Sequence, residues 1–525
     1  MLNRYHISNS YRYILYVLAV LPVFIFRDYT PDNELRYLSI ADEALCNGSI
    51  FTFTNHGLNY ADKPPLYLWI VMFGKFLLGK HSMLFLGIFS FVPALVILHV
   101  MDKWVRNVLS ESERLIGQLM LLTSGFFMGT AIVLRMDMLM CMFIVLALYT
   151  FFRMYRGRGK PHDWLLFPVF VFLAIFTKGP MGIIVPLIST SVFLILKREL
   201  HTIGKYWGWK TLAVLLTLCG IWFAGVYAEG GSQYLENLLF NQTLNRAMDS
   251  FHHKEPFYYY FETIWYSLAP WSLLYIGILV VGLKKKLAST DLELFFLVVA
   301  LSTFVSLSIF SSKLAVYMLP AIPFIAYIAL LWITKFDSPK WMLPLIGIPA
   351  GILSLALPGI FVAQQFVDTI ELTTSPFLIV SASILSISGI VTLTHLIRFK
   401  LHRSIGTMSI GILLAVFVLS FGIPKYNSFI GLNQLCDQAK NTAAQKGAAN
   451  YYYCEMSRAG NLDVYLGVKP EMLTIGDLYK KDSRIKKPAI LFLRTKAIDQ
   501  NDSLKVFVQD KKIHQMGGSC YIEIE

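Results

Sequence analysis

The sequence predicts an all-α polytopic membrane protein with about 13 transmembrane helices, followed by a small C-terminal α/β domain. Three observations lead to this fold class. The 525 residues are 56% hydrophobic and only 15% charged, with a mean hydropathy of +0.56, whereas soluble domains carry more charge. Apolar runs close to the length of a membrane span recur through residues 1–424. Residues 425–525 then change to the pattern of a soluble domain.

The predicted membrane spans are apolar runs that each approach the length needed to cross a bilayer. They cover 11–28, 82–100, 115–134, 137–153, 163–177, 180–196, 210–228, 263–283, 291–310, 314–334, 341–363, 376–397 and 405–423. The first run follows Arg4 and Arg12, as a signal peptide would, but no small-residue cleavage site comes after it. We therefore expect an uncleaved first helix.

Loop charge assigns the two sides of the membrane. One further apolar run, Leu66 to Leu78, is short and contains Lys75. If this run lies flat on the outer surface as an interfacial helix, every basic loop falls on the inner side, as the positive-inside rule requires. The inner segments are then 1–12, 101–114, 153–162, 197–210, 284–290, 335–340 and 398–404. If the run crossed the membrane, most of these loops would face outward. Cytoplasmic anchoring therefore explains the net charge of +13, and we expect no nucleic-acid partner.

The outer side then receives two long loops, 29–81 and 229–262, together with everything after residue 424. We expect a transmembrane domain over 1–424 and a soluble outer domain over 425–525. In the first outer loop, the pattern predicts a second interfacial helix that Thr30 or Asp32 caps. Asn47-Gly48 would end that helix.

The outer C-terminal domain is predicted to contain one amphipathic helix, Leu432 to Ala449, and several short strands. The predicted strands are 451–453, 463–466, 489–493 and 519–523. In an oxidising compartment two of Cys436, Cys454 and Cys520 can form a disulfide, and the sequence does not select which two.

Asp32-Asn33-Glu34, followed by Arg36, is the strongest local signal of chemistry in the chain. A carboxylate at a membrane surface can act as a general base, and an arginine can hold a phosphate. The alternative is a capped surface helix with a salt bridge. Further along, Lys63 precedes two prolines and can bind a lipid phosphate as a point charge. Snorkelling to the membrane surface is the alternative for this lysine.

Very short outer turns carry the remaining charged candidates. Asp137 follows Arg135 between two apolar runs and provides either a second active-site carboxylate or a salt bridge that caps two helices. Lys178 lies in a second such turn, and Lys313 lies four residues before Tyr317 in a third. Together with Lys63, these lysines run against the positive-inside bias, which favours a functional role.

A metal site is a further candidate. His252 and His253 precede an aromatic run and can join Asp62 or Glu255 around a divalent metal. The alternative assigns the aromatic run to the membrane interface and gives the histidines no ligand.

Six motifs in order resemble those of a known family. They are Asn33 to Tyr37, Asp62 to Pro65, Asp137, Thr177 to Pro180, His252 to Pro256 leading to Pro270-Trp271, and Lys313 to Pro320. Over roughly residues 11 to 425 the chain resembles the bacterial lipid-carrier-dependent glycosyltransferases of the GT-C class. Within that class it is similar to the aminoarabinose transferases that modify lipid A, which are related to the protein O-mannosyltransferases.

The resemblance implies an inverting transfer of a sugar, for example an amino sugar, from a polyprenyl phosphate such as undecaprenyl phosphate. The acceptor would be lipid A or another glycolipid on the periplasmic side of the bacterial inner membrane. The N-terminus would be cytoplasmic and the C-terminal domain periplasmic. The implied catalytic carboxylates are Asp32, Glu34 and Asp137, and the implied donor-binding residues are Arg36, Lys63, Lys178, Lys313 and Tyr317. The aspartate of the family pattern falls on Asn33, so the residue that acts as the base stays open.

Three other functions remain as alternatives. A protein O-glycosyltransferase would use the same donor. A lipid-sugar flippase would place its charges near the middle of the membrane, often on broken helices with internal repeats, whereas here the charges lie at outer helix ends and no repeat is visible. A protein that only binds polyprenyl phosphate is suggested by Asn33.

Overall fold

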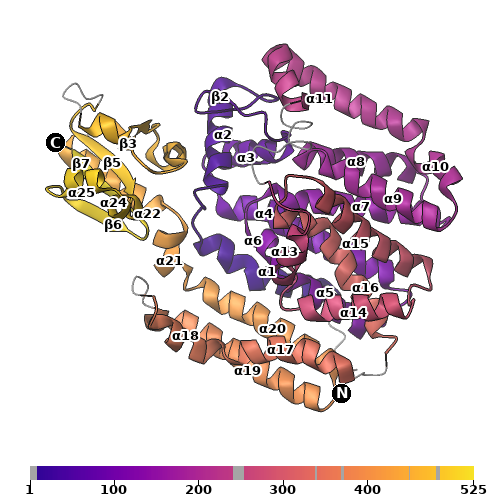
Figure 1. Cartoon of the computed structure of the whole chain (residues 1–525). Helices are drawn as coiled ribbons and strands as arrows, with labels where there is room; N and C mark the ends of the chain where they lie inside the picture. The colour runs from indigo at the N-terminus through magenta and orange to yellow at the C-terminus, as the bar shows by residue number, and fades with distance from the viewer. Residues whose placement is uncertain are drawn as a thin grey trace. The chain divides into compact units, whose positions relative to one another are not determined.

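The computed structural model describes residues 9–240, 254–336, 340–367, 372–447, 450–479 and 485–524. The chain forms two compact units (Figure 1). The first, here called the helical unit, contains the residues up to Pro22, Ala61–Tyr67 and Leu84–Ser420. The second, here called the mixed unit, contains Val23–Tyr60, Leu68–Met83 and the residues from Phe421 onward. The segments of the first outer loop thus divide between the two units.

The helical unit is built almost entirely from α-helices (Figure 1). Its first half contains α1 (Asn9–Phe26, shared with the mixed unit), α4 (Met83–Val105), α5 (Glu111–Leu122), α6 (Gly125–Ile132), α7 (Met136–Tyr155), α8 (Asp163–Lys178), α9 (Met181–Leu196), α10 (Gly204–Trp207) and α11 (Trp209–Glu236). Its second half contains α13 (Tyr259–Ser267), α14 (Ser272–Lys284), α15 (Asp291–Ile309), the 3-10 segment η4 (Ala315–Ala321), α16 (Ile322–Ile333), α17 (Leu343–Ser354), α18 (Ala356–Gln364), α19 (Pro376–Ile397) and α20 (Leu401–Ser420).

Each of the thirteen predicted spans coincides with a helix or with a pair of consecutive helices. In the described part of the chain, seven helices are long and apolar enough to cross a membrane, or nine if each bent pair is one span. The bent pairs are α5 with α6, at 68°, and α17 with α18, at 47°. The polytopic helical fold is therefore confirmed, whereas the count of thirteen is not. The predicted span 263–283 is broken at Pro270, because proline cannot donate the next helical hydrogen bond.

The core of the helical unit surrounds α16. Every residue of this helix is buried, as expected for a helix that is apolar on all sides. Aromatic rings fill the neighbouring space, with the centroid of Phe295 lying 5.0 Å from that of Phe193 and 5.7 Å from that of Phe151. This packing fixes α7, α9 and α15 relative to one another.

Four of the basic segments predicted on the inner side meet at the start of α15. Arg156 Nη1 lies 2.6 Å from Asp291 Oδ2, and Lys197 Nζ lies 2.8 Å from Asp291 Oδ1. Lys335 pairs with Glu293 one turn further along. The segments that follow α7, α9, α14 and α16 therefore share one end of the helical unit, as the loop-charge argument requires.

The mixed unit combines parts of the first outer loop with the C-terminal residues. Its elements are α2 (Glu34–Asn47), β1 (Thr54–Asn55), β2 (Leu58–Asn59), most of α3 (Leu66–Leu78), α21 (Ile423–Ile430), α22 (Asn433–Lys446), β3 (Asn450–Tyr453), η7 (Ala459–Leu462), α23 (Asp463–Leu466), β4 (Glu471–Met472), η8 (Ile475–Leu478), β5 (Ala489–Arg494), α24 (Thr495–Gln500), α25 (Asp502–Val508), β6 (Ile513–Met516) and β7 (Ser519–Ile524). Strands β4-β3-β5-β7-β6 form one sheet, in which β3 is parallel to β4 and β5 and the remaining pairs are antiparallel.

Most sequence predictions for the mixed unit are confirmed. The interfacial candidate 66–78 is a helix, α2 ends at Gly48 in the left-handed conformation (φ +71°), and α22, β3, β5 and β7 form as expected. The predicted strand 463–466 is wrong, because Asp463 accepts the backbone N–H of Val464 at 2.7 Å and starts the short helix α23. Strands β4 and β6 were not predicted.

The disulfide that the sequence left open is not formed. Cys436, Cys454 and Cys520 are all free and fully buried. Cys454 and Cys520 belong to the apolar core of the sheet, whereas Cys436 lies on α22. Each thiol therefore behaves as a small apolar side chain rather than as half of a cross-link.

Asp28 ties the end of α1 to the C-terminal residues within the mixed unit. Its Oδ1 accepts the Tyr465 hydroxyl at 2.7 Å, and its Oδ2 accepts the backbone N–H of Asn433 at 2.9 Å. Asn427 Oδ1 accepts the backbone N–H of Asp28 at 3.0 Å. Gly431 lies against this carboxylate, since a Cβ atom there would come within 2.1 Å of Asp28 Oδ2.

Gly431→Ala is therefore expected to destabilise the mixed unit by about 1–3 kcal/mol, because the bound carboxylate cannot move without losing its hydrogen bonds. Thermal unfolding and limited proteolysis of the purified full chain measure the effect. Gly476→Ala is the control, because its Cβ would meet only Thr474 Oγ1, at 3.8 Å. Equal stability of the two variants would contradict this description of the Asp28 contacts.

Candidate active site

Asp137 is the buried centre of a charged cluster in the helical unit. It lies in the first turn of α7 and is 1% exposed. Helix N-termini stabilise carboxylates at this position. Arg135 Nε donates to its Oδ2 at 2.9 Å, and Lys178 Nζ donates to its Oδ1. Both carboxylate oxygens are therefore held by cations.

Lys178 reaches Asp137 from the last turn of α8, where the helix dipole favours a cation. Gly179 ends this helix with a positive φ of +87°, which a glycine adopts without strain. The Lys178 ammonium also lies 4.5 Å from the centre of the Tyr317 ring, in cation–π contact. Three motifs that are far apart in the sequence thus meet at one lysine.

Lys313 lies on the same segment as Tyr317 and is 3% exposed. Its Nζ donates to the backbone oxygen of Glu255 at 2.8 Å, and the Glu255 N–H donates to the backbone oxygen of Ser311 at 3.2 Å. Burial lowers the pKa of Lys313, and the Glu255 carboxylate partly opposes this effect. The end of the second long outer loop is therefore joined to the Lys313 segment, as the predicted topology requires.

The opening stretch of the first outer loop lies in the mixed unit. Glu34 is 1% exposed and receives both Nη atoms of Arg27, at 2.8 and 2.6 Å. Its Oε2 also accepts the backbone N–H of Thr30 at 2.7 Å. This geometry favours a structural role for Glu34. The expected cap by Thr30 or Asp32 is not formed, since α2 has Asn33 at its N-cap without a side-chain bond.

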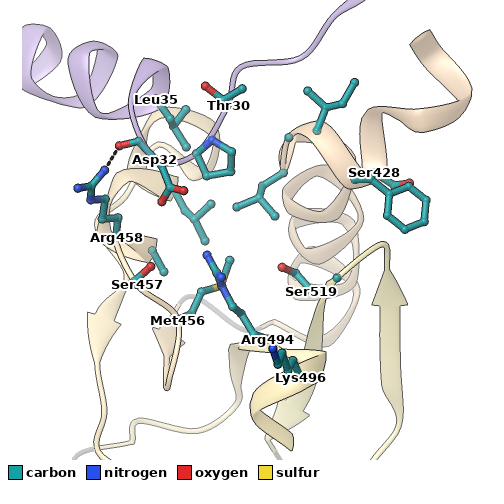
Figure 2. A pocket seen from close by; sticks show the side chains of 18 residues that line it. Thr30, Asp32, Leu35, Ser428, Met456, Ser457, Arg458, Arg494, Lys496 and Ser519 are labelled. Atoms are coloured by element: carbon teal, nitrogen blue, oxygen red, sulfur yellow. Dashed lines mark hydrogen bonds between the residues drawn. The ribbon is translucent and has the colours of Figure 1, made fainter. Parts of the chain in front are cut away.

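Asp32 differs from the other two candidate carboxylates because it is exposed. Arg458 donates to its backbone oxygen, and its carboxylate points into a cavity of the mixed unit (Figure 2). Arg36 lies in the first turn of α2, with its guanidinium carbon 5.7 Å from the centre of the Tyr37 ring and 5.5 Å from that of Tyr60. Such stacking holds an arginine plane in a defined orientation.

The remaining candidates belong to other segments of the chain. Asp62 and Lys63 are half-buried in the Ala61–Tyr67 segment of the helical unit. His252 and His253 lie outside the described residues, so the metal site stays a prediction. Within the described residues, no group of three or more His, Cys, Asp or Glu side chains is placed to hold a metal ion.

Sequence reasoning missed two members of these clusters as site residues. The sequence identified Arg135 only as a neighbour of Asp137. In the structure its side chain, which is 30% exposed, pairs with the Asp137 carboxylate and adds its positive charge to the cluster. Arg27 lies at the end of the first apolar run, where a basic residue is usually interfacial. Nothing in its local pattern indicates that it pairs with Glu34.

Comparison with known proteins finds similarity over part of the sequence. Residues 62–223 match the family model for dolichyl-phosphate-mannose-protein mannosyltransferases. An uncharacterised protein of Aquifex aeolicus is 29% identical over 60% of this chain and 62% of its own length. The undecaprenyl phosphate-alpha-4-amino-4-deoxy-L-arabinose arabinosyl transferase of Edwardsiella ictaluri is 26% identical over 59% of this chain and 55% of its own length. The matched region thus spans little more than half of these relatives.

Solved structures agree over almost the whole chain. The fold resembles that of ArnT from Cupriavidus metallidurans bound to undecaprenyl phosphate, with a TM-score of 0.74, 17% identity and 98% coverage of both chains. The apo form of the same protein gives a TM-score of 0.71 at 18% identity. The resemblance to the GT-C class glycosyltransferases predicted from the six motifs is therefore confirmed in sequence and in fold. The particular fold is ArnT-like.

Proposed function

We propose that this protein is an inverting glycosyltransferase that moves a sugar from a polyprenyl-phosphate carrier to a lipid acceptor. The single observation that carries the proposal is the contact of Lys178 with both Asp137 and Tyr317. Two cations, Arg135 and Lys178, surround one carboxylate, so the cluster keeps a net positive charge. A buried, oriented ammonium is suited to a phosphate leaving group, and Tyr317 supplies a ring against which a sugar can stack.

In the proposed reaction, the bond between the sugar's anomeric carbon and the carrier phosphate oxygen breaks while an acceptor oxygen attacks the opposite face. Negative charge grows on the departing phosphate, and preorganised cations stabilise it without further reorganisation. Lys178, Arg135 and Lys313 are assigned this role, and Arg36 and Lys63 are assigned to holding the donor. The acceptor gives up its proton to a base.

We assign the base to Asp32 rather than to Glu34 or Asp137. Glu34 is neutralised by Arg27, and both oxygens of Asp137 are held by cations. A carboxylate in such contacts accepts a proton poorly. Asp137 then acts by positioning Lys178. If the acceptor oxygen belongs to a phosphate, as in the transfer to lipid A, little base is needed, and Asn33 in place of the family aspartate is then less damaging.

We further propose a location in the bacterial inner membrane with the N-terminus in the cytoplasm, a transmembrane domain over 1–424 and a periplasmic domain over 425–525. The meeting of four basic segments at Asp291 and Glu293 supports this orientation. Alkaline phosphatase fused to the C-terminus should be active, whereas a fusion in the 156–162 loop should be inactive. The reverse pattern would contradict the orientation.

An acceptor panel tests the proposed reaction. Purified full-length protein in nanodiscs is given radiolabelled undecaprenyl-phosphate sugars with lipid A, other glycolipids or protein as acceptors. We expect label on a lipid acceptor. Label on protein alone would favour protein O-glycosylation, and donor binding or flipping without any transfer would contradict an enzyme. A chelator added to the same assay tests the divalent metal predicted at Asp62, His252 and His253.

A further inference from the structure

The mixed unit contains a cavity of about 440 Å³, and of the residues assigned to the proposed reaction Asp32 lies on its lining (Figure 2). Its volume falls within the range of about 300–1,000 Å³ that is typical of small-molecule sites. Three cations line it, Arg458, Arg494 and Lys496, against one carboxylate, that of Asp32. The cavity therefore carries a net positive charge.

The cavity lies where an open α/β sheet usually binds ligands. Strands β3 and β5 run parallel, and the residues that follow their carboxyl ends line the cavity. Met456 to Arg458 follow β3, while Arg494 ends β5 and Lys496 comes just after it. Ligands of open parallel sheets bind at this edge, because the loops there converge around one space. The position is thus an independent reason to expect a ligand.

The walls of the cavity are fixed by backbone contacts. Gly517 has a φ of +55°, and a Cβ atom there would lie 2.1 Å from the backbone oxygen of Ser428, so the β6–β7 turn packs directly on α21. Thr495 N–H donates to the backbone oxygen of Gly518 at 3.1 Å, which joins the β5 end to the start of β7. These contacts therefore hold in place the backbone segments that carry the cations.

The cations themselves are available for a ligand. Arg494 and Lys496 are both exposed residues on the lining, and Figure 2 shows Arg494 and Asp32 pointing into the cavity from opposite walls. Arg458 donates to the Asp32 backbone oxygen, yet an arginine carries five N–H donors, so others remain. The hydroxyls of Ser457 and Ser519 also lie on the lining.

We propose that this cavity binds a phosphate monoester, and that the natural ligand is the phosphorylated headgroup of the acceptor lipid. Arginine forks match the oxygens of a phosphate, and lysine adds a point charge. Apolar side chains on the same lining, Leu35, Phe429 and Met456, suit the carbon skeleton next to the phosphate. The binding of a phosphate stands on the cavity alone, whereas the identification with the acceptor rests on the proposed function.

Binding by the purified full-length protein tests the proposal without requiring any transfer. Titration calorimetry is carried out with short-chain phosphatidic acid, inorganic phosphate and short-chain phosphatidylcholine. We expect phosphatidic acid to bind, phosphatidylcholine not to bind, and Arg494→Gln/Lys496→Gln to weaken binding at least about tenfold. Lys512→Gln, which removes an exposed lysine outside the cavity, should leave binding unchanged.

The outcomes distinguish a lipid headgroup from free phosphate as the ligand. They also distinguish the proposed phosphate site from the proposed transfer reaction. Tighter binding of phosphatidic acid than of inorganic phosphate supports a lipid headgroup, and equal binding overturns that part. Binding that survives Arg494→Gln/Lys496→Gln, or no binding of either phosphate, overturns the site. Binding of the carrier undecaprenyl phosphate is measured in the same variants and should persist, because the Lys178 cluster lies in the helical unit. A failure of transfer in the acceptor panel leaves these results unchanged, so the two proposals fail separately.

Discussion

Lys178→Met is expected to lower the turnover number for sugar transfer by about 100- to 1,000-fold, the effect of removing one preorganised donor from a developing oxyanion. The lysine is held by Asp137 and faces the Tyr317 ring, so no other side chain of the cluster can take its position. Single-turnover rates with radiolabelled donor measure the loss. Undecaprenyl phosphate binding, measured in parallel, separates a loss of chemistry from a loss of the donor.

The matched control is Lys197→Met. Lys197 also ends a predicted span and also pairs with an aspartate, Asp291, but it lies at the opposite, predicted cytoplasmic, end. The two variants lose the same charge and a similar ion pair. We expect transfer by Lys197→Met to stay within about twofold of wild type, because a partly exposed pair contributes little. Similar losses in both variants would indicate a general effect of ion pairs on the fold and would contradict a role for Lys178 in catalysis.

Substitution of Asp32 is expected to lower the rate of transfer, whereas substitution of Glu34 is expected to lower the stability of the protein. With an acceptor that attacks through a hydroxyl oxygen, Asp32→Asn should lower transfer by about 100- to 10,000-fold, as expected for loss of a general base, and should leave stability unchanged. Glu34→Gln should destabilise the protein by about 3–5 kcal/mol, because it leaves the Arg27 charge buried without its partner. Transfer rates and thermal unfolding of the same preparations measure both effects.

The double variant Arg27→Met/Glu34→Gln is the control for this pair. It removes the buried charge together with its partner, so much of the stability lost in Glu34→Gln should return. Transfer at a temperature where every variant is folded should then be close to that of wild type. Transfer abolished by Glu34→Gln under those conditions, with Asp32→Asn active, would show that the two carboxylates have been assigned the wrong way round.

Much of the fold could be predicted because lipid restricts the chain so strongly. Apolar length locates the spans, and the basic loops give a topology in which Asp137, Lys178 and Lys313 share one side. The number of crossings could not be predicted in the same way. Breaks such as that at Pro270 and the 68° bend between α5 and α6 depend on tertiary packing rather than on hydropathy.

The sequence predicted the residues of the candidate site better than it predicted the contacts between them. Lys178 could be identified as a candidate because it lies in a short turn at a helix end. Its contact with Tyr317 joins positions far apart in the sequence and has no local signal. Glu34 was a catalytic candidate because it is a carboxylate at a predicted membrane surface, and its partner Arg27 had no local signal. Arg494 and Lys496, two cations of the cavity, lie at the end of a strand that has no unusual sequence pattern. Their position indicates a ligand site only once the parallel pairing of β3 and β5 is known.

The stoichiometry and stereochemistry of a single reaction test the proposed transfer from a polyprenyl-phosphate carrier. A single reaction of purified protein with a defined polyprenyl-phosphate sugar is followed for the sugar on the acceptor, the anomeric configuration of the product and the free polyprenyl phosphate. We expect one carrier phosphate to be released for each sugar transferred, inversion at the anomeric carbon, and loss of both signals in Lys178→Met. Retention of configuration, or release of carrier phosphate that does not match transfer, would contradict the proposed transfer.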